Sequence, residues 1–359
     1  MSRPVRRLFV NTVPWLLEQN PLLLTTAMFD NPESFSRLDP ETCLRSAEIQ
    51  GYRPTGALFP LNSYENRVYE IALNDGSPLI AKYYRPGHWS AKAIAEEHLF
   101  MRALDEAEIP VVLPHVLREP LELVSSLGQI NGFYYCFYPK FGGREHAEIT
   151  DDDRRWLGRT LGRLHNVGAV FKSQHRWHLT PKTFGADSLE FILQQTFLPQ
   201  DLRHSIKTHL EQALALLTPY FHDDLEQFAL HGDCHPGNIL WNQSGPTLVD
   251  FDDMVIGPPV QDIWMLLHGT PEERQRQEEC FFEGYSMFRD FDRSTLRLIE
   301  PLRTLRMIRH AAWIGQRYEE AIFQRAFPYY PERRYWEGFL LHIKEQISLL
   351  QEVPWQENP

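Results

Sequence analysis

Short apolar runs bounded by turn residues follow one another through the first 140 residues and predict a small β-sheet. The Asn-Asp-Gly-Ser turn at 74–77 lies between two such runs, as expected for a hairpin. A helical stripe formed by Ile94, Met101 and Leu104 predicts a helix over 90–105, with Ser90 as its N-cap. The predicted strands cover residues 56–60, 67–73, 78–84, 111–118 and 132–138.

From residue 151 the apolar spacing changes to that of helices. The segment 140–144, Lys-Phe-Gly-Gly-Arg, has linker composition and is the expected hinge. The fold class is therefore predicted to be α+β, with an N-terminal extension at 1–34, a small β-rich lobe at 35–139 and a larger, mainly helical lobe at 140–359. The predicted helices of the larger lobe cover residues 155–167, 189–217 (one or two helices), 271–288, 293–318 and 335–350, with another beginning near Ile263.

The segment 230–258, LHGDCHPGNILWNQSGPTLVDFDDMVIGP, contains the main candidate catalytic residues. Its apolar runs predict a β-hairpin with Asn238 at the mouth of one strand and Asp250 at the end of the other. Mg²⁺ binds carboxylates, amide oxygens and phosphate oxygens, so Asn238 and Asp250 are the predicted metal ligands, and Asp250 is thereby also catalytic. Asp233, in the loop before the hairpin, can then orient an acceptor hydroxyl and receive its proton. The loop resembles the His-Gly-Asp form of the catalytic loop in the protein-kinase fold; a plain Asp/Asn-rich turn is the alternative.

A nucleotide site is expected in the small lobe. Lys82 ends an apolar strand and resembles the strand lysine that contacts the α and β phosphates in the kinase fold. Glu97 lies on the buried stripe of the predicted helix, and a buried carboxylate needs a partner such as Lys82; Glu96 is the alternative. The loop at 61–66 has no G-x-G-x-x-G pattern, so Ser63 and nearby backbone amides are the expected phosphate contacts, unless Ser63 is only a turn residue.

Composition excludes several classes of protein. The 359 residues are 43% hydrophobic and 13% aromatic, which is typical of a folded globular chain. The net charge of −12 argues against a nucleic-acid binder that neutralises many phosphates. Four cysteines without a C-x-x-C pair predict neither a disulfide framework nor a structural zinc site. No apolar segment reaches the length of about 18 residues needed to span a membrane, so a cytoplasmic protein is expected.

Several longer strings together resemble one bacterial family, the stress-response kinase A family: LNSYENRVYEI, AKYYRPGHWS, EEHLF, HGDCHPGNILW and GPPVQDIWMLL. That family shares its branch of the kinase fold with aminoglycoside phosphotransferases and choline kinases. The resemblance implies a two-lobed protein-kinase-like fold, ATP and Mg²⁺ as cofactors, transfer to Ser or Thr of a protein substrate, and a monomeric cytoplasmic enzyme of stress response. It implies these roles: Asp233 as proton acceptor, Asn238 and Asp250 as Mg²⁺ ligands, Ser63 at the ATP site, and Asp262 as a structural brace. It does not extend to the N-terminal extension.

Three other functions fit part of the pattern. The same local chemistry would serve a small hydroxyl compound, such as an amino alcohol or a sugar. A nucleotide-binding scaffold without turnover is a second alternative, although every polar role expected of a kinase is filled. A metal-dependent hydrolase is the third, but it leaves Lys82 and Asn238 without roles. Its ligands would be His231, Asp233, His235, Asp250 and Asp252.

Four basic residues of the predicted helix at 293–318 share one helical face: Arg303, Arg306, Arg309 and His310. This face could bind an acidic or phosphorylated acceptor, but a solvated face is the expectation. Cys234, next to the candidate catalytic aspartate, is expected to be a small buried packing residue instead of a redox sensor.

Overall fold

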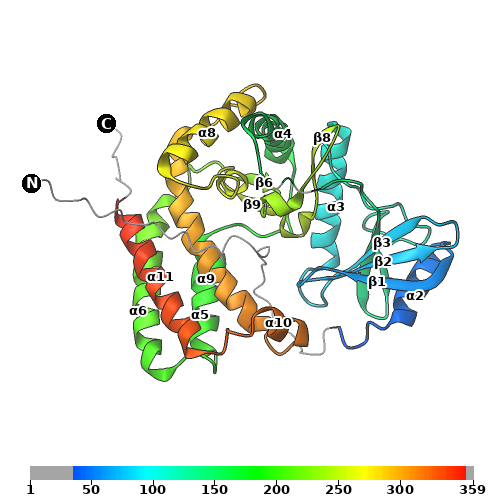
Figure 1. Ribbon diagram of the computed structural model, residues 1–359, viewed down its shortest axis with the longest axis horizontal. Helices are drawn as coiled ribbons and strands as arrows, with labels where there is room; N and C mark the ends of the chain where they lie inside the picture. Colours follow the sequence, from blue (N-terminus) through cyan, green and yellow to red (C-terminus); the bar gives the residue numbers. More distant parts are fainter. Residues whose placement is uncertain (1–34, 145, 147, 353–359) are drawn as a thin grey trace, which may run out of the picture.

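The computed structural model describes residues 35–144, 146 and 148–352, so the predicted extension at 1–34 lies outside the described residues. Figure 1 shows two lobes, a β-rich one on the right and a mainly helical one on the left. The predicted α+β organisation, with a small β-rich lobe preceding a larger helical one, is confirmed.

The small lobe is built on five antiparallel strands in the order β1-β2-β3-β5-β4. The helix α2 (Pro40–Ile49) packs against this sheet through an apolar cluster that includes Cys43, Ala47 and Tyr83. The strands are β1 (Pro54–Leu61), β2 (Arg67–Leu73), β3 (Pro78–Tyr83), β4 (Gly128–Ile130) and β5 (Phe133–Pro139).

One predicted strand is wrong. Residues 111–118 form no strand; Val111 makes only an isolated bridge to Leu248 in the larger lobe. Pro114 interrupts this apolar run, and proline cannot donate a ladder hydrogen bond. The fifth strand is β4, which reaches β5 through Asn131 and Gly132, both at positive φ. An Asn-Gly pair between short apolar runs is a strong hairpin signal that the sequence does contain.

The helix α3 (Ala91–Glu106) links the two lobes. Its first turn is capped as predicted, because the Ser90 side chain accepts a hydrogen bond from the backbone N of Ala93 at 3.2 Å. The stripe at Phe100, Met101 and Leu104 is buried in an apolar cluster together with residues of the larger lobe. The helix that carries Glu97 is therefore held against both lobes.

The larger lobe contains the predicted helices with changed boundaries. The segment predicted at 189–217 divides into two helices, and the helix predicted at 293–318 begins with a 3₁₀ turn over Arg293–Leu298. A π-helical turn, Pro181–Ala186, precedes the first of these helices. The helices are α4 (Asp151–Val170), α5 (Asp187–Gln194), α6 (Gln200–Leu217), α7 (Gln261–Trp264), α8 (Pro271–Tyr285), α9 (Ile299–Arg317), α10 (Ala321–Ala326) and α11 (Arg333–Glu352).

Two short two-stranded sheets lie in the larger lobe, next to the interface with α3 (Figure 1). The hairpin β7–β8 is the predicted one, with Asn242 paired to Gly245 across the turn. Its apolar side chains Ile239, Trp241 and Leu248 belong to the same buried cluster as α4 and α8. The strands are β6 (Phe228–Leu230), β7 (Ile239–Asn242), β8 (Gly245–Leu248) and β9 (Val255–Gly257).

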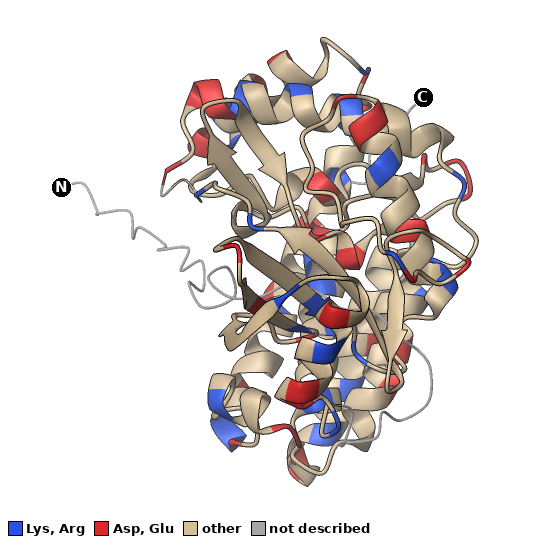
Figure 2. Ribbon diagram, turned by 90° about the vertical axis from the view of Figure 1, so that its right-hand side faces the viewer, with Lys and Arg blue, Asp and Glu red and all other residues tan. Residues whose placement is uncertain are grey.

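The surface carries mixed charge. Figure 2 shows basic and acidic residues interspersed over both lobes. Within the described part of the chain, none of the helices has the length and hydropathy required to cross a membrane.

Candidate active site

The loop that follows β6 is held in place by its own backbone amides. The carboxylate of Asp262, at the start of α7, accepts hydrogen bonds from the backbone N of His231 and of Gly232, both at 2.8 Å. Gly232 has φ +89°, and a Cβ there would collide with the carbonyl oxygen of Asp253. Glycine is the residue that adopts this positive φ without strain and has no Cβ to collide with that oxygen. The structure thus places Asp262 as the brace of this loop.

Asp233 is fully buried, and its two carboxylate oxygens are in different environments. Oδ1 accepts a hydrogen bond from Arg306 Nη1 at 2.7 Å. Oδ2 has no hydrogen-bond partner among the described residues, although His235 Nε2 lies 3.4 Å away. Burial opposes ionisation of Asp233, but the charges of Arg306 and His235 outweigh it and lower the pKa of this carboxyl. The group is therefore a buried, ionised carboxylate in which Oδ1 is hydrogen-bonded and Oδ2 is not.

Asn238 and Asp250 come together through the β7–β8 hairpin. The backbone N of Val249 donates to the carbonyl O of Asn238 at 3.1 Å, so Asp250 follows directly beside Asn238. Asn238 Nδ2 donates to the carbonyl O of Asp233 at 3.0 Å, which leaves its amide oxygen turned away from that carbonyl. Asp250 adopts φ +60°, which is uncommon for a residue other than glycine and directs its side chain out of the strand path.

The donor set fits a hard divalent cation. An amide oxygen and a carboxylate are the ligand types that Mg²⁺ takes when substrate phosphates complete its coordination. The side chain of Asp250 is 45% exposed, so it is accessible to a bound nucleotide, whereas Asp252 is 4% exposed. Asp252 instead forms a buried ion pair, with its Oδ1 3.1 Å from Lys82 Nζ. Asn238 and Asp250 are accordingly the residues that could hold the metal.

Lys82 on β3 faces three carboxylates. Its Nζ lies 3.1 Å from Asp250 Oδ1, 3.1 Å from Asp252 Oδ1 and 3.7 Å from Glu97 Oε1. Burial favours the neutral amine, but these three charges outweigh it and raise the pKa of Lys82 well above its usual value. Burial also raises the pKa of Asp252 to about 6. From the sequence, Asp252 was expected only as a ligand of the hydrolase alternative, although its position in the Asp-Phe-Asp-Asp run places it two residues after Asp250.

Glu97 and Glu96 have separate tasks. Glu97 contacts Lys82 through Oε1 and Arg176 Nη2 through Oε2, the latter at 2.6 Å. Glu96 instead accepts hydrogen bonds from the Ser173 hydroxyl at 2.6 Å and from the backbone amides of 174–176, and so binds the loop before Trp177. The structure therefore brings Lys82 together with Glu97 and not with Glu96.

Arg176 is a site residue that the sequence analysis missed. It is 3% exposed, and its guanidinium also donates to the carbonyl O of Asp252 at 2.5 Å and to the carbonyl O of Ala93 at 2.9 Å. It lies over the Trp89 ring with its Cζ 4.1 Å from the centroid. Arg176 thus connects α3, the segment after Asp250 and the loop held by Glu96. No motif in the sequence marks it.

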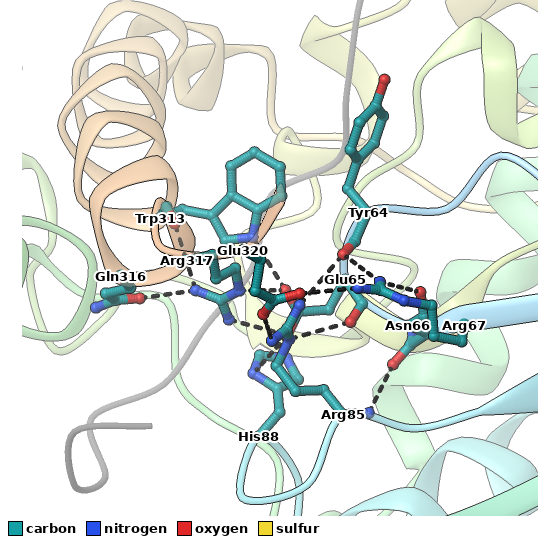
Figure 3. Close-up of polar contacts among 10 residues, drawn as sticks. All are labelled: Tyr64, Glu65, Asn66, Arg67, Arg85, His88, Trp313, Gln316, Arg317 and Glu320. Carbon is teal, nitrogen blue, oxygen red and sulfur yellow. Dashed lines mark hydrogen bonds and ion pairs between the residues drawn. The ribbon is translucent and has the colours of Figure 1, made fainter. Parts of the chain in front are cut away.

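Ser63 lies in the loop between β1 and β2 and is partly buried. Among the described contacts, none joins its hydroxyl to Lys82 or Asp250. The residues that follow it, however, are firmly held. Six acidic, basic or histidine residues drawn in Figure 3 join this loop to the end of α9, and we name them the Glu65 cluster: Glu65, Arg67, Arg85, His88, Arg317 and Glu320.

Glu65 is at the centre of the Glu65 cluster. Its Oε2 lies 2.6 Å from Arg317 Nε, and its Oε1 lies 3.2 Å from Arg85 Nε and 3.2 Å from His88 Nδ1. Glu320 forms a second centre, because it pairs with Arg85 and lies 2.8 Å from Arg67. Burial lowers the pKa of His88 to about 3, so the imidazole is neutral here. The cluster fastens the loop of Ser63, from the small lobe, to the larger lobe.

The basic face of α9 is not solvated, so that expectation is wrong. Arg309 is 1% exposed and lies over the Trp177 ring with its Cζ 5.8 Å from the centroid. Arg306 reaches Asp233, and Arg303 pairs with Glu300. Helical periodicity shows that these side chains share a face but not what that face packs against.

The histidines of the loop after β6 are engaged with the backbone. His231 Nε2 is 2.9 Å from the carbonyl O of Val249, and His235 Nδ1 accepts from the backbone N of Gly237 at 3.0 Å. These contacts oppose the metal-hydrolase hypothesis, which needs both rings as ligands. Cys234 is completely buried, and burial raises the pKa of its thiol well above the usual value, which fits a packing residue.

Comparison with known proteins places this geometry in a family. A family model described as "Phosphotransferase enzyme family" matches residues 58–299. "Stress response kinase A" of Escherichia coli (strain K12) is 36% identical over 326 residues, which cover 91% of this chain and 98% of that protein. "Serine/threonine protein kinase RdoA" of Salmonella typhimurium (strain LT2) is 34% identical over 332 residues, with 92% and 99% covered.

Solved structures of small-molecule kinases share the fold. The amicoumacin kinase hAmiN, in complex with AMP-PNP, Ca²⁺ and Ami, aligns with a TM-score of 0.70 at 20% identity and covers 88% of this chain and 96% of its own. A microcompartment-associated aminopropanol kinase aligns with a TM-score of 0.63 at 17% identity, with 87% and 96% covered. These likenesses confirm the predicted two-lobed kinase-like fold.

Proposed function

Because the chain belongs to the phosphotransferase enzyme family and, within it, to the stress response kinase A group, we propose that it is an ATP- and Mg²⁺-dependent kinase that phosphorylates serine or threonine of a protein. The observation that supports this most directly is the position of the ionised Asp233 beside Asn238 and Asp250. Lys82, within 3.1 Å of Asp250, adds a fixed positive charge to the same place.

In the proposed reaction, Asp233 orients the acceptor hydroxyl and receives its proton. The hydroxyl oxygen bonds to the γ-phosphorus of ATP, and the bond from that phosphorus to the β–γ bridging oxygen breaks, so that ADP leaves with the bonding electrons. Lys82, aligned by Glu97, contacts the α and β phosphates. Asn238 and Asp250 would hold Mg²⁺, which would neutralise charge on the phosphate oxygens.

The choice of a protein acceptor follows the relatives. A relative at 34% identity is named a serine/threonine protein kinase and is matched over nearly its whole length. A small hydroxyl compound is the second candidate acceptor, because the structural neighbours act on amicoumacin and on aminopropanol by their names. At 20% and 17% identity, those neighbours support the fold and not the acceptor.

The proposal includes a monomeric enzyme in the cytoplasm, acting in stress response. All four cysteines are free and buried, which suits a reducing compartment. The relatives' printed names support the stress-response role.

The test is transfer of labelled γ-phosphate from Mg-ATP by the full chain and by Asp233→Asn. Each is incubated with a generic protein acceptor, with a panel of amino alcohols and sugars, and with neither. Label on serine or threonine that is lost in Asp233→Asn is the expected result. Label on a small compound only would replace the protein acceptor with the second candidate, and no Asp233-dependent transfer to any acceptor would overturn the proposed function.

A further inference from the structure

Arg306 is the cation that contacts the candidate catalytic carboxylate directly. It lies on α9, 73 residues after Asp233, and its Nη1 is 2.7 Å from Asp233 Oδ1. The same nitrogen is 3.0 Å from the sulfur of Met265. The side chain is 18% exposed, whereas that of Asp233 is 0% exposed. Arg306 is therefore the more exposed partner of a contact whose carboxylate is fully buried.

The contact makes the two oxygens of Asp233 inequivalent. Oδ1 accepts a hydrogen bond from the guanidinium, and Oδ2 has no hydrogen-bond partner within the described part of the chain. On the side of Oδ2, His235 Nε2 lies 3.4 Å away, and Nδ1 of the same ring accepts a hydrogen bond from Gly237 N at 3.0 Å. A buried carboxylate oxygen without a hydrogen-bond partner destabilises the fold unless a bound ligand donates a hydrogen bond to it. The acceptor hydroxyl is the group that the proposed reaction brings there.

We propose that Arg306 is a positioning residue for phosphoryl transfer: it holds Asp233 through Oδ1 so that Oδ2 faces the acceptor hydroxyl. The proposal rests on the proposed function, because it gives Asp233 the role of proton acceptor. As the hydroxyl oxygen bonds to the γ-phosphorus and ADP departs, the hydroxyl proton passes to Oδ2, while Oδ1 keeps its contact with Arg306. A group that fixes the orientation of the proton acceptor affects turnover more than nucleotide binding.

The neighbouring arginines of α9 provide matched controls. Arg303, one turn earlier, pairs with Glu300 at 2.5 Å and lies over the Trp264 ring with its Cζ 5.5 Å from the centroid. Arg309, one turn later, lies over Trp177. Arg303 is 33% exposed in its side chain, closer to Arg306 in this respect than the buried Arg309 is. Arg303→Ala therefore removes a similar charge from the same helix without touching Asp233.

The experiment compares wild type, Arg306→Ala, Arg306→Lys and Arg303→Ala in the labelled-phosphate assay, with kcat and the KM for ATP measured separately. Arg306→Ala should lower kcat by about 100-fold with a KM for ATP within about twofold of wild type. Arg306→Lys keeps the positive charge but lacks the planar guanidinium, so its kcat should lie between those of Arg306→Ala and wild type. Added guanidinium at millimolar concentration should raise the rate of Arg306→Ala and leave that of Arg303→Ala unchanged.

A double variant separates this inference from the proposed function. In an Asp233→Asn background, Arg306→Ala should change any residual rate of transfer much less than it changes the rate of the otherwise wild-type chain, because both substitutions act on one contact. Loss of activity in Asp233→Asn together with equal rates for Arg306→Ala and Arg303→Ala would overturn the inference alone. Full activity of Asp233→Asn would overturn the proposed function instead. If Arg306→Ala does not fold, Arg306→Lys and Arg306→Gln take its place, and rates equal to that of Arg303→Ala would then overturn the inference.

Discussion

Glu65 Oε2 lies 2.6 Å from Arg317 Nε, although 252 residues separate the two in the chain. The contact joins the loop that carries Ser63 to the last turn of α9, and so joins the two lobes (Figure 3). Burial opposes ionisation of Glu65, but the charges of Arg317 and Arg85 outweigh it and lower the pKa of this carboxyl. The loop expected to cover the phosphates is therefore fastened to the larger lobe by a buried charge.

Glu65→Gln should destabilise the chain and weaken nucleotide binding together. Removing one partner of a buried charge network leaves the other charges uncompensated, which costs about 3 kcal/mol or more. Because the loop then loses its attachment, the KM for ATP should rise. Glu70→Gln is the control: Glu70 pairs with the exposed Lys140 at 2.9 Å, and such a surface pair contributes at most about 1 kcal/mol. Urea unfolding and steady-state kinetics measure both effects, and equal stability losses in the two variants would contradict the role of the Glu65 cluster.

If Asn238 and Asp250 are the metal ligands, substitutions of Asp250 and Asp233 should impair different steps. Asp250→Asn and Asn238→Ala should weaken the binding of a non-hydrolysable ATP analogue in the presence of Mg²⁺, since each removes a candidate ligand. Asp233→Asn should abolish transfer and leave analogue binding near the wild-type value, since Asp233 faces the acceptor. Calorimetric titration with and without Mg²⁺ measures the difference. Equal Mg²⁺-dependent affinities in Asp250→Asn and wild type would refute the assignment.

Adjacent glutamates of α3 should respond differently to the same substitution. Glu97→Gln loses the charge that aligns Lys82, so kcat/KM for ATP should fall at least about tenfold, equivalent to about 1.4 kcal/mol. Glu96→Gln weakens the hold on residues 173–176 and should lower the thermal midpoint, with a smaller loss of kcat/KM. A larger loss of kcat/KM in Glu96→Gln than in Glu97→Gln would contradict the assignment of Glu97 as the partner of Lys82.

Stability should fall as the solution becomes acidic, in part because of His98. Its ring nitrogens contact the Tyr84 hydroxyl at 2.9 Å and the Ser126 hydroxyl at 2.8 Å, and burial lowers the pKa of His98 to about 4. An unfolded histidine has a pKa of about 6.5. The contribution of His98 to the free energy of unfolding is complete above the unfolded pKa of about 6.5. It is lost as the pH falls towards 4, because the unfolded chain then binds a proton that the folded chain does not. The slope is up to about 1.4 kcal/mol per pH unit.

The check is the free energy of unfolding in urea at pH 7.5, 6.5, 5.5 and 4.5. His98→Gln should flatten the pH dependence relative to wild type, whatever its effect at pH 7.5. His204→Gln, on the exposed surface of α6, serves as the control and should follow the wild-type slope. Parallel slopes for wild type and His98→Gln would show that His98 does not contribute.

The local pattern predicted those elements that one stretch of chain decides. The hairpin at Asn238 and Asp250, the capped helix at Ser90 and the helices of the larger lobe are all present. The strand predicted at 111–118 is wrong, because Pro114 lies inside this apolar run and cannot donate a ladder hydrogen bond. The strand that completes the sheet is instead indicated by the Asn131-Gly132 turn. Both signals were in the sequence, so this error was one of interpretation.

The sequence alone determined the fold class, the placement of Asp233, Asn238 and Asp250 in one segment, and the position of Glu97 on the buried stripe of its helix. These follow from turn chemistry and from the periods of strand and helix, which depend only on neighbouring residues. Only the tertiary structure decided that Arg306 contacts Asp233, that Arg176 contacts Glu97, and that Glu65 contacts Arg317. The physical reason is that an ion pair between distant segments depends on how the lobes pack. Helical spacing places the arginines of α9 on one face, but it does not determine whether that face is exposed to solvent or contacts a buried carboxylate.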